Sequence, residues 1–127
     1  MTGSFQELRV WQNGMRLSLE IYRATKGFPK DELYGLTSQL RRAAISVPNN
    51  IAEGKGYKSN KDLLRFLYMA RGSCLEVQSE LIIAGQLEYL SKDAAQKLLD
   101  DAAVVGRELN AMIAVFERRV SAKAAGA

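Results

Sequence analysis

The sequence predicts an all-α protein: an antiparallel up-down-up-down four-helix bundle with its second helix kinked at Pro48. Four segments repeat apolar residues at three- and four-residue steps, the period of an α-helix. The connections between them are short, which favours antiparallel neighbours. No segment competes with them as a strand. At 127 residues the chain fits one domain, expected at residues 1–121, followed by a frayed Ala-, Lys- and Gly-rich tail at residues 122–127.

The first helix is predicted over residues 4–26 and carries apolar residues on two nearly opposite sides. The side expected to enter the bundle holds Leu8, Trp11, Met15, Leu19 and Tyr22. The other side holds Val10, Leu17, Ile21 and Ala24. Because a surface helix of a monomer usually has a single apolar stripe, the second side predicts contact between subunits through Val10, Leu17 and Ile21. An oligomer is therefore favoured over a monomer.

The second helix is predicted over residues 30–53. It begins with the acids Asp31 and Glu32, which the helix macrodipole favours in a first turn. Pro48 lies within the apolar repeat and has no N–H to donate to the carbonyl of Ala44. A kink is expected at that point.

The third helix has the strongest periodic signal in the chain. Ser59 and Asp62 match a capping box at its start. The apolar residues that follow alternate steps of four and three, the seam spacing of four-helix bundles: Leu63, Leu67, Ala70, Cys74, Val77, Leu81 and Ala84. Ser91 caps a fourth helix. Its expected core face is Leu98, Ala102, Val105, Leu109, Met112, Phe116 and Val120.

The composition argues against catalysis and against a bound metal. The chain has no histidine, so it lacks the usual base for a serine or cysteine nucleophile and the ligands of a di-iron bundle. Its one cysteine, Cys74, cannot build a zinc site and lies in an apolar helical pattern typical of a core thiol. Gly54-Lys55-Gly56 lacks the spacing of a phosphate-binding loop and is better explained as a helix stop. Neither a cofactor nor a small-molecule substrate is expected.

Glu76 and Glu80 leave one catalytic alternative open. They lie one turn apart on the third helix, so a paired-carboxylate acid/base site is conceivable. We favour ion pairs between these carboxylates and Arg41, Arg42 or Arg71 across the bundle. The protein is therefore expected not to be an enzyme.

The chain is expected to be cytoplasmic and to have no contact with a membrane. Its first residues carry charges where a signal peptide would need an apolar run. No stretch approaches the ~20 apolar residues of a membrane span.

The charge distribution points to a polyanionic partner. Residues 41–71 carry seven basic and two acidic residues, whereas the part that follows has a small acidic excess. The candidates for contact with nucleic acid are Arg42, Lys55, Tyr57, Lys58, Lys61 and Arg65. The Tyr57 ring is available to stack on a base. On charge alone, a solvated face around a loop explains these residues equally well.

Three stretches of the chain resemble a known family. The run from Tyr34 to Gly54, YGLTSQLRRAAISVPNNIAEG, closely resembles the signature of the bacterial 23S rRNA intervening-sequence proteins, also called four helix bundle proteins. Phe66–Ser73, followed by Glu76, resembles a second signature of that family. Leu8, Val10, Trp11 and Gln12 resemble a third, so the resemblance spans almost the whole chain.

This resemblance implies a homopentamer, a ring of bundles around a central channel. The family is similar to the accessory variability determinant of diversity-generating retroelements, which partners a reverse transcriptase and binds nucleic acid. The resemblance thus implies RNA, DNA or a reverse-transcriptase-like enzyme as a partner. The competing hypothesis is a protein-interaction scaffold without affinity for nucleic acid.

The polar positions that match the family's signatures are expected to be structural. We interpret Arg41, Asn50, Glu53, Ser73 and Glu76 as an internal hydrogen-bonded network that fixes the kinked second helix. The better candidates for phosphate contact are Lys55, Lys58, Lys61 and Arg65.

Overall fold

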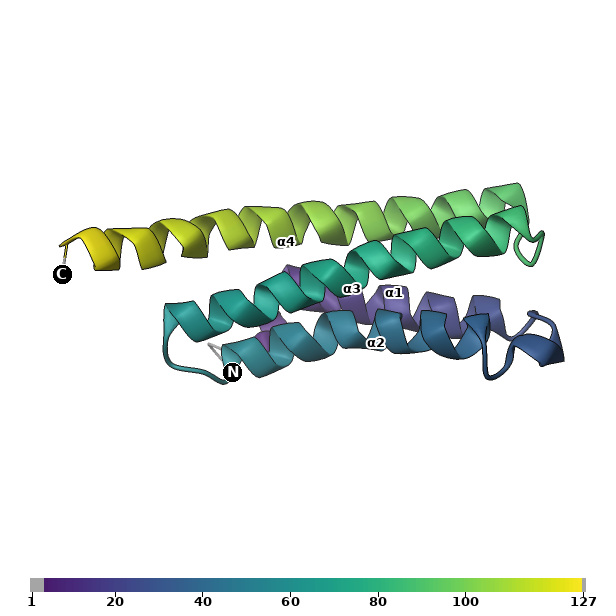
Figure 1. Ribbon diagram of the computed structural model, residues 1–127, viewed down its shortest axis with the longest axis horizontal. Helices are drawn as coiled ribbons and strands as arrows, with labels where there is room; N and C mark the ends of the chain where they lie inside the picture. The colour runs from purple at the N-terminus through teal and green to yellow at the C-terminus, as the bar shows by residue number, and fades with distance from the viewer. Residues whose placement is uncertain (1–3, 127) are drawn as a thin grey trace.

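A computed structural model describes residues 4–126 as four packed α-helices, with no strand among them. The helices are α1 (Arg9–Thr25), α2 (Leu36–Lys55), α3 (Asn60–Gln86) and α4 (Lys92–Gly126), and two short 3-10 helices are η1 (Phe5–Glu7) and η2 (Lys30–Glu32). The α1–α2 and α3–α4 connections lie at one end of the molecule and the α2–α3 connection at the other (Figure 1). The predicted all-α four-helix bundle is confirmed.

The seam predicted for the third helix lies in the core. All seven of its residues, from Leu63 to Ala84, are buried in α3. The core face of α4 is shifted slightly from the prediction. Its buried residues are Ala95, Leu98, Ala102, Val105, Leu109 and Ile113, and Met112, Phe116 and Val120 pack against them while partly exposed.

The two apolar sides of α1 do not divide as predicted, although Leu8 and Trp11 of the expected inner side pack against the core while partly exposed. Val10, Leu17 and Ile21, expected at a subunit contact, are 6%, 2% and 0% exposed and belong to the core of the bundle. Leu19 and Tyr22, expected in the core, are 46% and 37% exposed. The subunit contact predicted through Val10, Leu17 and Ile21 is therefore wrong, because those side chains are already covered within one chain.

Small residues explain which side of α1 faces inward. Gly14 and Ser18 are buried on the same side as Val10 and Ile21. A Cβ atom on Gly14 would lie 3.4 Å from Val47 Cγ1, at van der Waals contact, so α1 and α2 lie close together here and only a small side chain fits. Apolar periodicity identifies the helix but not its inward side when both sides are apolar.

Ser18 also provides a hydrogen bond that Pro48 cannot. Pro48 lies inside α2, where its ring nitrogen has no hydrogen for the carbonyl of Ala44. The Ser18 hydroxyl lies 2.9 Å from the Ala44 oxygen and 3.0 Å from the Gly14 oxygen, and its one hydrogen serves these two acceptors. The helix is continuous on both sides of Pro48, and a kink there stays a prediction.

The second helix begins later than predicted. Asp31 and Glu32 lie in η2, and α2 begins at Leu36 after the N-cap residue Gly35. Glu32 still serves the helix start, because its Oε1 accepts a hydrogen bond of 3.1 Å from the Leu36 N–H. The Tyr89 hydroxyl donates to its other oxygen at 2.8 Å. These two bonds lower the pKa of Glu32.

The fourth helix is the longest and does not end at Ser121. It continues to Gly126, so the residues of the expected tail are helical as far as they are described, and Ala127 lies outside the described residues. The C-terminal part of α4 projects beyond the bundle at the end where α2 and α3 are connected (Figure 1).

Candidate nucleic-acid interface

A groove with four basic side chains lies between the α2–α3 connection and the C-terminal part of α4. Its volume is about 490 Å³, and it is lined by Lys58, Ser59, Asn60, Lys61, Arg119, Val120, Lys123 and Ala124. All four cations are exposed. We call this feature the basic groove. Exposed cations around one groove are suited to phosphate groups.

The capping box at the start of α3 shapes one wall of the basic groove. The Ser59 hydroxyl accepts a hydrogen bond of 3.0 Å from the Asp62 N–H and lies 2.9 Å from the Asp62 carboxylate. Ser59, Asn60 and Lys61 line the groove, so the N-terminal end of α3 borders it, and the helix macrodipole adds positive potential there. The Asp62 carboxylate also lies 4.0 Å from the Arg65 guanidinium, so the two form an ion pair in which Arg65 partly balances the charge of Asp62.

An aromatic pair links the α2–α3 connection, which forms one wall of the basic groove, to α3. The Tyr57 ring stacks on Phe66 with a centroid distance of 5.1 Å and an interplanar angle of 26°. The Arg65 guanidinium lies 4.6 Å from the centroid of the Phe66 ring. Phe66 is buried, but Tyr57 is 48% exposed. The interface thus combines cations with an accessible aromatic ring.

Gly54, near the end of α2, also allows α2 and α3 to pack closely. A Cβ atom at this position would lie 2.8 Å from Leu63 Cδ1 and 3.0 Å from Phe66 Cβ. The absence of a side chain therefore lets the end of α2 lie directly against the first turns of α3.

The structure places the residues predicted to contact nucleic acid in two separate regions. Lys58 and Lys61 line the basic groove, and Lys55, Tyr57 and Arg65 belong to the adjoining ends of α2 and α3. Arg42 lies elsewhere, at a pocket of about 430 Å³ between α2 and α3.

Arg119 and Lys123 were missed by the sequence reasoning. The part of the chain that contains them has more acidic than basic residues. Its net charge therefore gives no sign of these two cations, which lie one helical turn apart. The available signal was the length of the fourth helix. In an antiparallel bundle, a fourth helix longer than its neighbours brings its C-terminal residues beyond the α2–α3 connection.

The five residues predicted as one polar network do not form a single network in the structure. The Asn50 amide donates to the Ser46 carbonyl and hydroxyl at 2.8 and 2.9 Å. The Ser46 hydroxyl lies 2.8 Å from the Ser73 hydroxyl, which links α2 to α3. Ser46 was absent from the prediction. Glu53 and Glu76 are exposed.

Arg41 faces α1 instead. Its Nε donates to the Thr25 hydroxyl at 2.8 Å, and its Nη2 donates to the Tyr22 carbonyl at 3.3 Å. Its guanidinium also lies 4.7 Å from the centroid of the Tyr22 ring. Arg41 therefore fixes α2 to the end of α1, and the polar contacts between α2 and α3 are made by Ser46, Asn50 and Ser73.

Glu80 is the most perturbed acid of the α2–α3 pocket. This pocket is also lined by Gln39, Arg42, Ala43, Ser46, Ser73 and Glu76. Within the described chain, Glu80 Oε1 is buried without a hydrogen-bond partner. Burial, and then the charge of Glu76, raises the pKa of Glu80. The carboxyl can hold a proton above its ordinary range, but one perturbed acid does not complete a catalytic site.

The remaining candidates for chemistry are structural. Cys74 is buried in the core and donates its thiol hydrogen to the Ala102 carbonyl at 3.3 Å. Burial raises the pKa of this thiol, which disfavours the reactive thiolate. Among residues 4–126, no group of three or more Cys, Asp or Glu side chains could hold a metal ion.

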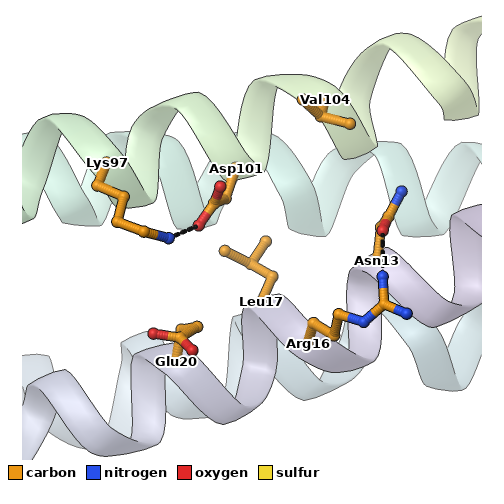
Figure 2. A pocket seen from close by; sticks show the side chains of 7 residues that line it. All are labelled: Asn13, Arg16, Leu17, Glu20, Lys97, Asp101 and Val104. Carbon is orange, nitrogen blue, oxygen red and sulfur yellow. Dashed lines mark hydrogen bonds and ion pairs between the residues drawn. The ribbon is translucent and has the colours of Figure 1, made fainter.

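A second charged pocket, of about 240 Å³, lies between α1 and α4 (Figure 2). Lys97 and Asp101 form an ion pair of 2.9 Å on its α4 side. On its α1 side, Arg16 donates to the Asn13 side chain at 3.1 Å. Charges that already pair with their own helix neighbours are typical of a solvated helix face. This pocket gives no indication of a ligand.

These features define a small four-helix-bundle protein with a basic groove and an aromatic ring at one end. No helix in the described part of the chain combines the length and apolar character that crossing a membrane requires. The chain belongs to the 23S rRNA-intervening sequence protein family, whose sequence model matches residues 6–111. The matched region includes the α2–α3 connection and ends before Arg119 and Lys123.

A solved structure has the same fold. It is a crystal structure, at 1.70 Å, of a protein with unknown function from the S23 ribosomal protein family of Bacteroides thetaiotaomicron. The two chains are 19% identical with a TM-score of 0.74, and the alignment covers 82% of this chain and 97% of the other. A comparison with curated proteins gives no match.

Proposed function

We propose that this protein is a non-enzymatic, oligomeric four-helix-bundle protein that binds nucleic acid, as structured RNA or DNA, through its basic groove. The observation that carries this proposal is the grouping of Lys58, Lys61, Arg119 and Lys123 around one groove. These cations come from two distant parts of the chain, so their grouping is a property of the fold. Lys58 and Lys61 alone would be explained by a solvated loop, so the proposal rests on the two cations of α4 that line the same groove.

The mechanism is neutralisation of phosphates. Each cation that contacts a phosphate releases a condensed counterion, so affinity falls as salt rises. The nearby acid Glu117 accepts a hydrogen bond of 2.5 Å from the Tyr68 hydroxyl, which occupies one of its oxygens. Asp62 is occupied by Ser59. Neither hydrogen bond removes the carboxylate charge, so these two acids offset part of the positive potential that the groove's four cations create.

The oligomer needs a different surface from the one predicted on α1. Along α3, Tyr68, Leu75 and Ile82 recur every seven residues and are 39%, 59% and 52% exposed. This step is the repeat of helices that pack against other helices. These side chains support contact between subunits through α3. In a closed ring, each subunit would present the same basic groove, and modest single contacts would combine.

Charge reversal tests the groove directly. The double variant Lys58→Glu with Lys61→Glu should lower the affinity for a fluorescently labelled structured RNA by at least about tenfold at ~50 mM salt. The matched control is Lys26→Glu with Lys30→Glu, which makes the same charge change on exposed residues at the opposite end of the bundle (Figure 1). Equal losses in both double variants would contradict a local interface and indicate attraction by net charge alone.

The second candidate is a protein-interaction scaffold without affinity for nucleic acid. The exposed apolar residues of α3 favour it, because they suit a helical protein partner as well as another subunit. A reverse-transcriptase-like enzyme, which the family resemblance implies, is one partner of this kind. Labelled RNA that stays free at both low and moderate salt would favour this alternative.

A further inference from the structure

Tyr57 is an exposed aromatic ring with a rigid support behind it. Its ring stacks on Phe66, which is only 6% exposed. Its backbone N–H donates to the Gly54 carbonyl at 3.2 Å, which closes the turn after α2. The ring is thus supported by the core and by the turn, while about half of its surface stays open to solvent. An aromatic ring held in this way is prepared to stack with little further loss of freedom.

Cations flank this ring along the chain. Lys55 precedes Tyr57 by two residues, and Lys58 follows it directly and lines the basic groove. Consecutive Cα atoms are about 3.8 Å apart, so the backbone of Tyr57 directly adjoins a residue that lines the groove. A cationic path beside a stacking platform is the arrangement by which proteins bind single-stranded nucleic acid.

We infer that the basic groove recognises unpaired nucleotides, with one base stacked on the open face of Tyr57 and the neighbouring phosphates held by the groove's cations. This inference rests on the proposed function and adds the class of ligand. A base within a duplex is already stacked on both sides and cannot present its face to a side chain. The nucleic acid must therefore offer a loop, a bulge or a free end at the groove.

A purely structural role for Tyr57 makes a different prediction. If the ring serves only to cover Phe66, any apolar side chain of similar size should replace it. Tyr57→Leu keeps an apolar cover but removes the aromatic face, whereas Tyr57→Phe keeps the face and removes only the hydroxyl. These two variants separate stacking from covering, and both preserve the charge of the groove.

The experiment compares two ligands with three proteins. Fluorescence anisotropy is used to titrate a labelled RNA strand of about 12 nucleotides, free or annealed to its complement, with wild type, Tyr57→Leu and Tyr57→Phe. Tyr57→Leu should weaken binding of the free strand by roughly ten- to a hundredfold, the contribution of one stacked base. Tyr57→Phe should bind within about twofold of wild type. The slope of affinity against salt should be the same in all three proteins, because no phosphate contact is lost.

Binding of the annealed duplex separates a loss of base stacking from a general loss of affinity for RNA. Duplex binding should change by less than about twofold in both variants, because no base is free to stack. An unchanged affinity of Tyr57→Leu for the free strand, or an equal loss for strand and duplex, would overturn the inference and leave the proposed function standing. Failure of wild type to bind either RNA at ~50 mM salt would overturn the proposed function itself, and this inference with it.

Discussion

At the scale of single residues, the proline in α2 depends on a partner in α1. A proline inside a helix leaves the carbonyl four residues earlier without its N–H donor, and here that carbonyl belongs to Ala44. The Ser18 hydroxyl reaches this oxygen at 2.9 Å, one turn after Gly14, where the backbone of α1 lies close to α2. One serine therefore both stabilises the proline-containing helix and joins it to α1.

Ser18→Ala should lower the free energy of unfolding by about 1–3 kcal/mol, because a buried carbonyl loses its hydrogen bond. In a Pro48→Ala background the new backbone N–H can donate to Ala44, so the same substitution should cost distinctly less. Urea denaturation of the four proteins of this cycle measures the difference. An equal cost in both backgrounds would show that Ser18 does not replace the missing donor.

Glu80 should make the protein less stable as pH rises. Because its pKa is higher in the folded chain than in the unfolded one, the folded state binds more protons between the two values. The contribution of Glu80 to stability is therefore greatest below the ordinary carboxyl range and is lost as pH rises through the raised pKa. Arg42 and the exposed acid Glu76 line the same pocket, and the Glu76 charge contributes to the shift.

Glu80→Gln should therefore raise the urea midpoint at neutral pH and reduce its fall as pH rises above the ordinary carboxyl range. The matched control is Glu76→Gln, which keeps the Glu80 carboxyl but removes the neighbouring charge that raises its pKa. This variant should show a smaller change in the same direction. A Glu80→Gln protein that loses stability at neutral pH would contradict this account of the pocket.

At the scale of helices, α3 is the central element because its whole seam is buried. Leu67 is 0% exposed, and Leu67→Ala should create a cavity that costs roughly 2–5 kcal/mol of unfolding free energy. The control is Leu75→Ala on the same helix, where the side chain is 59% exposed and the cost within one chain should be small. Chemical denaturation compares the two, and a negligible loss for Leu67→Ala would mean that α3 is not central.

Some features of the helices can be predicted from the sequence and others cannot. The seven-residue seam of α3 is visible because one side of that helix is apolar and the repeat is unbroken. The inward side of α1 is not, because both sides are apolar and the choice is made by Gly14 and Ser18 against α2. The start of α2 was predicted too early, because an acid that caps a helix from outside resembles one in its first turn.

The candidate site was predictable only in part for a similar reason. Lys58, Lys61 and Tyr57 are close in sequence, so their joint position is visible as a local motif. Arg119 and Lys123 reach the groove only because α4 continues past the end of the bundle, which is a consequence of tertiary packing and helix length. Arg42 has the right charge but lies in the wrong part of α2 to take part.

At the scale of the whole molecule, the exposed apolar residues of α3 should be covered by other copies of the chain. Light scattering of the purified protein in solution should give a mass of several chains, five if the family resemblance holds. Leu75→Glu with Ile82→Glu should shift that mass towards a single chain while the helix content measured by circular dichroism is retained. A wild-type mass equal to one chain would refute the oligomer.

The salt dependence of RNA binding tests the central claim most directly. A fluorescently labelled structured RNA with an unpaired loop is titrated with the wild-type protein at about 50 and 200 mM salt. Four phosphate contacts in one groove predict that affinity falls by about a hundredfold between the two conditions, and more if several grooves act together. Binding that is unchanged by salt, or absent at both concentrations, would contradict the proposal that the basic groove is a nucleic-acid interface.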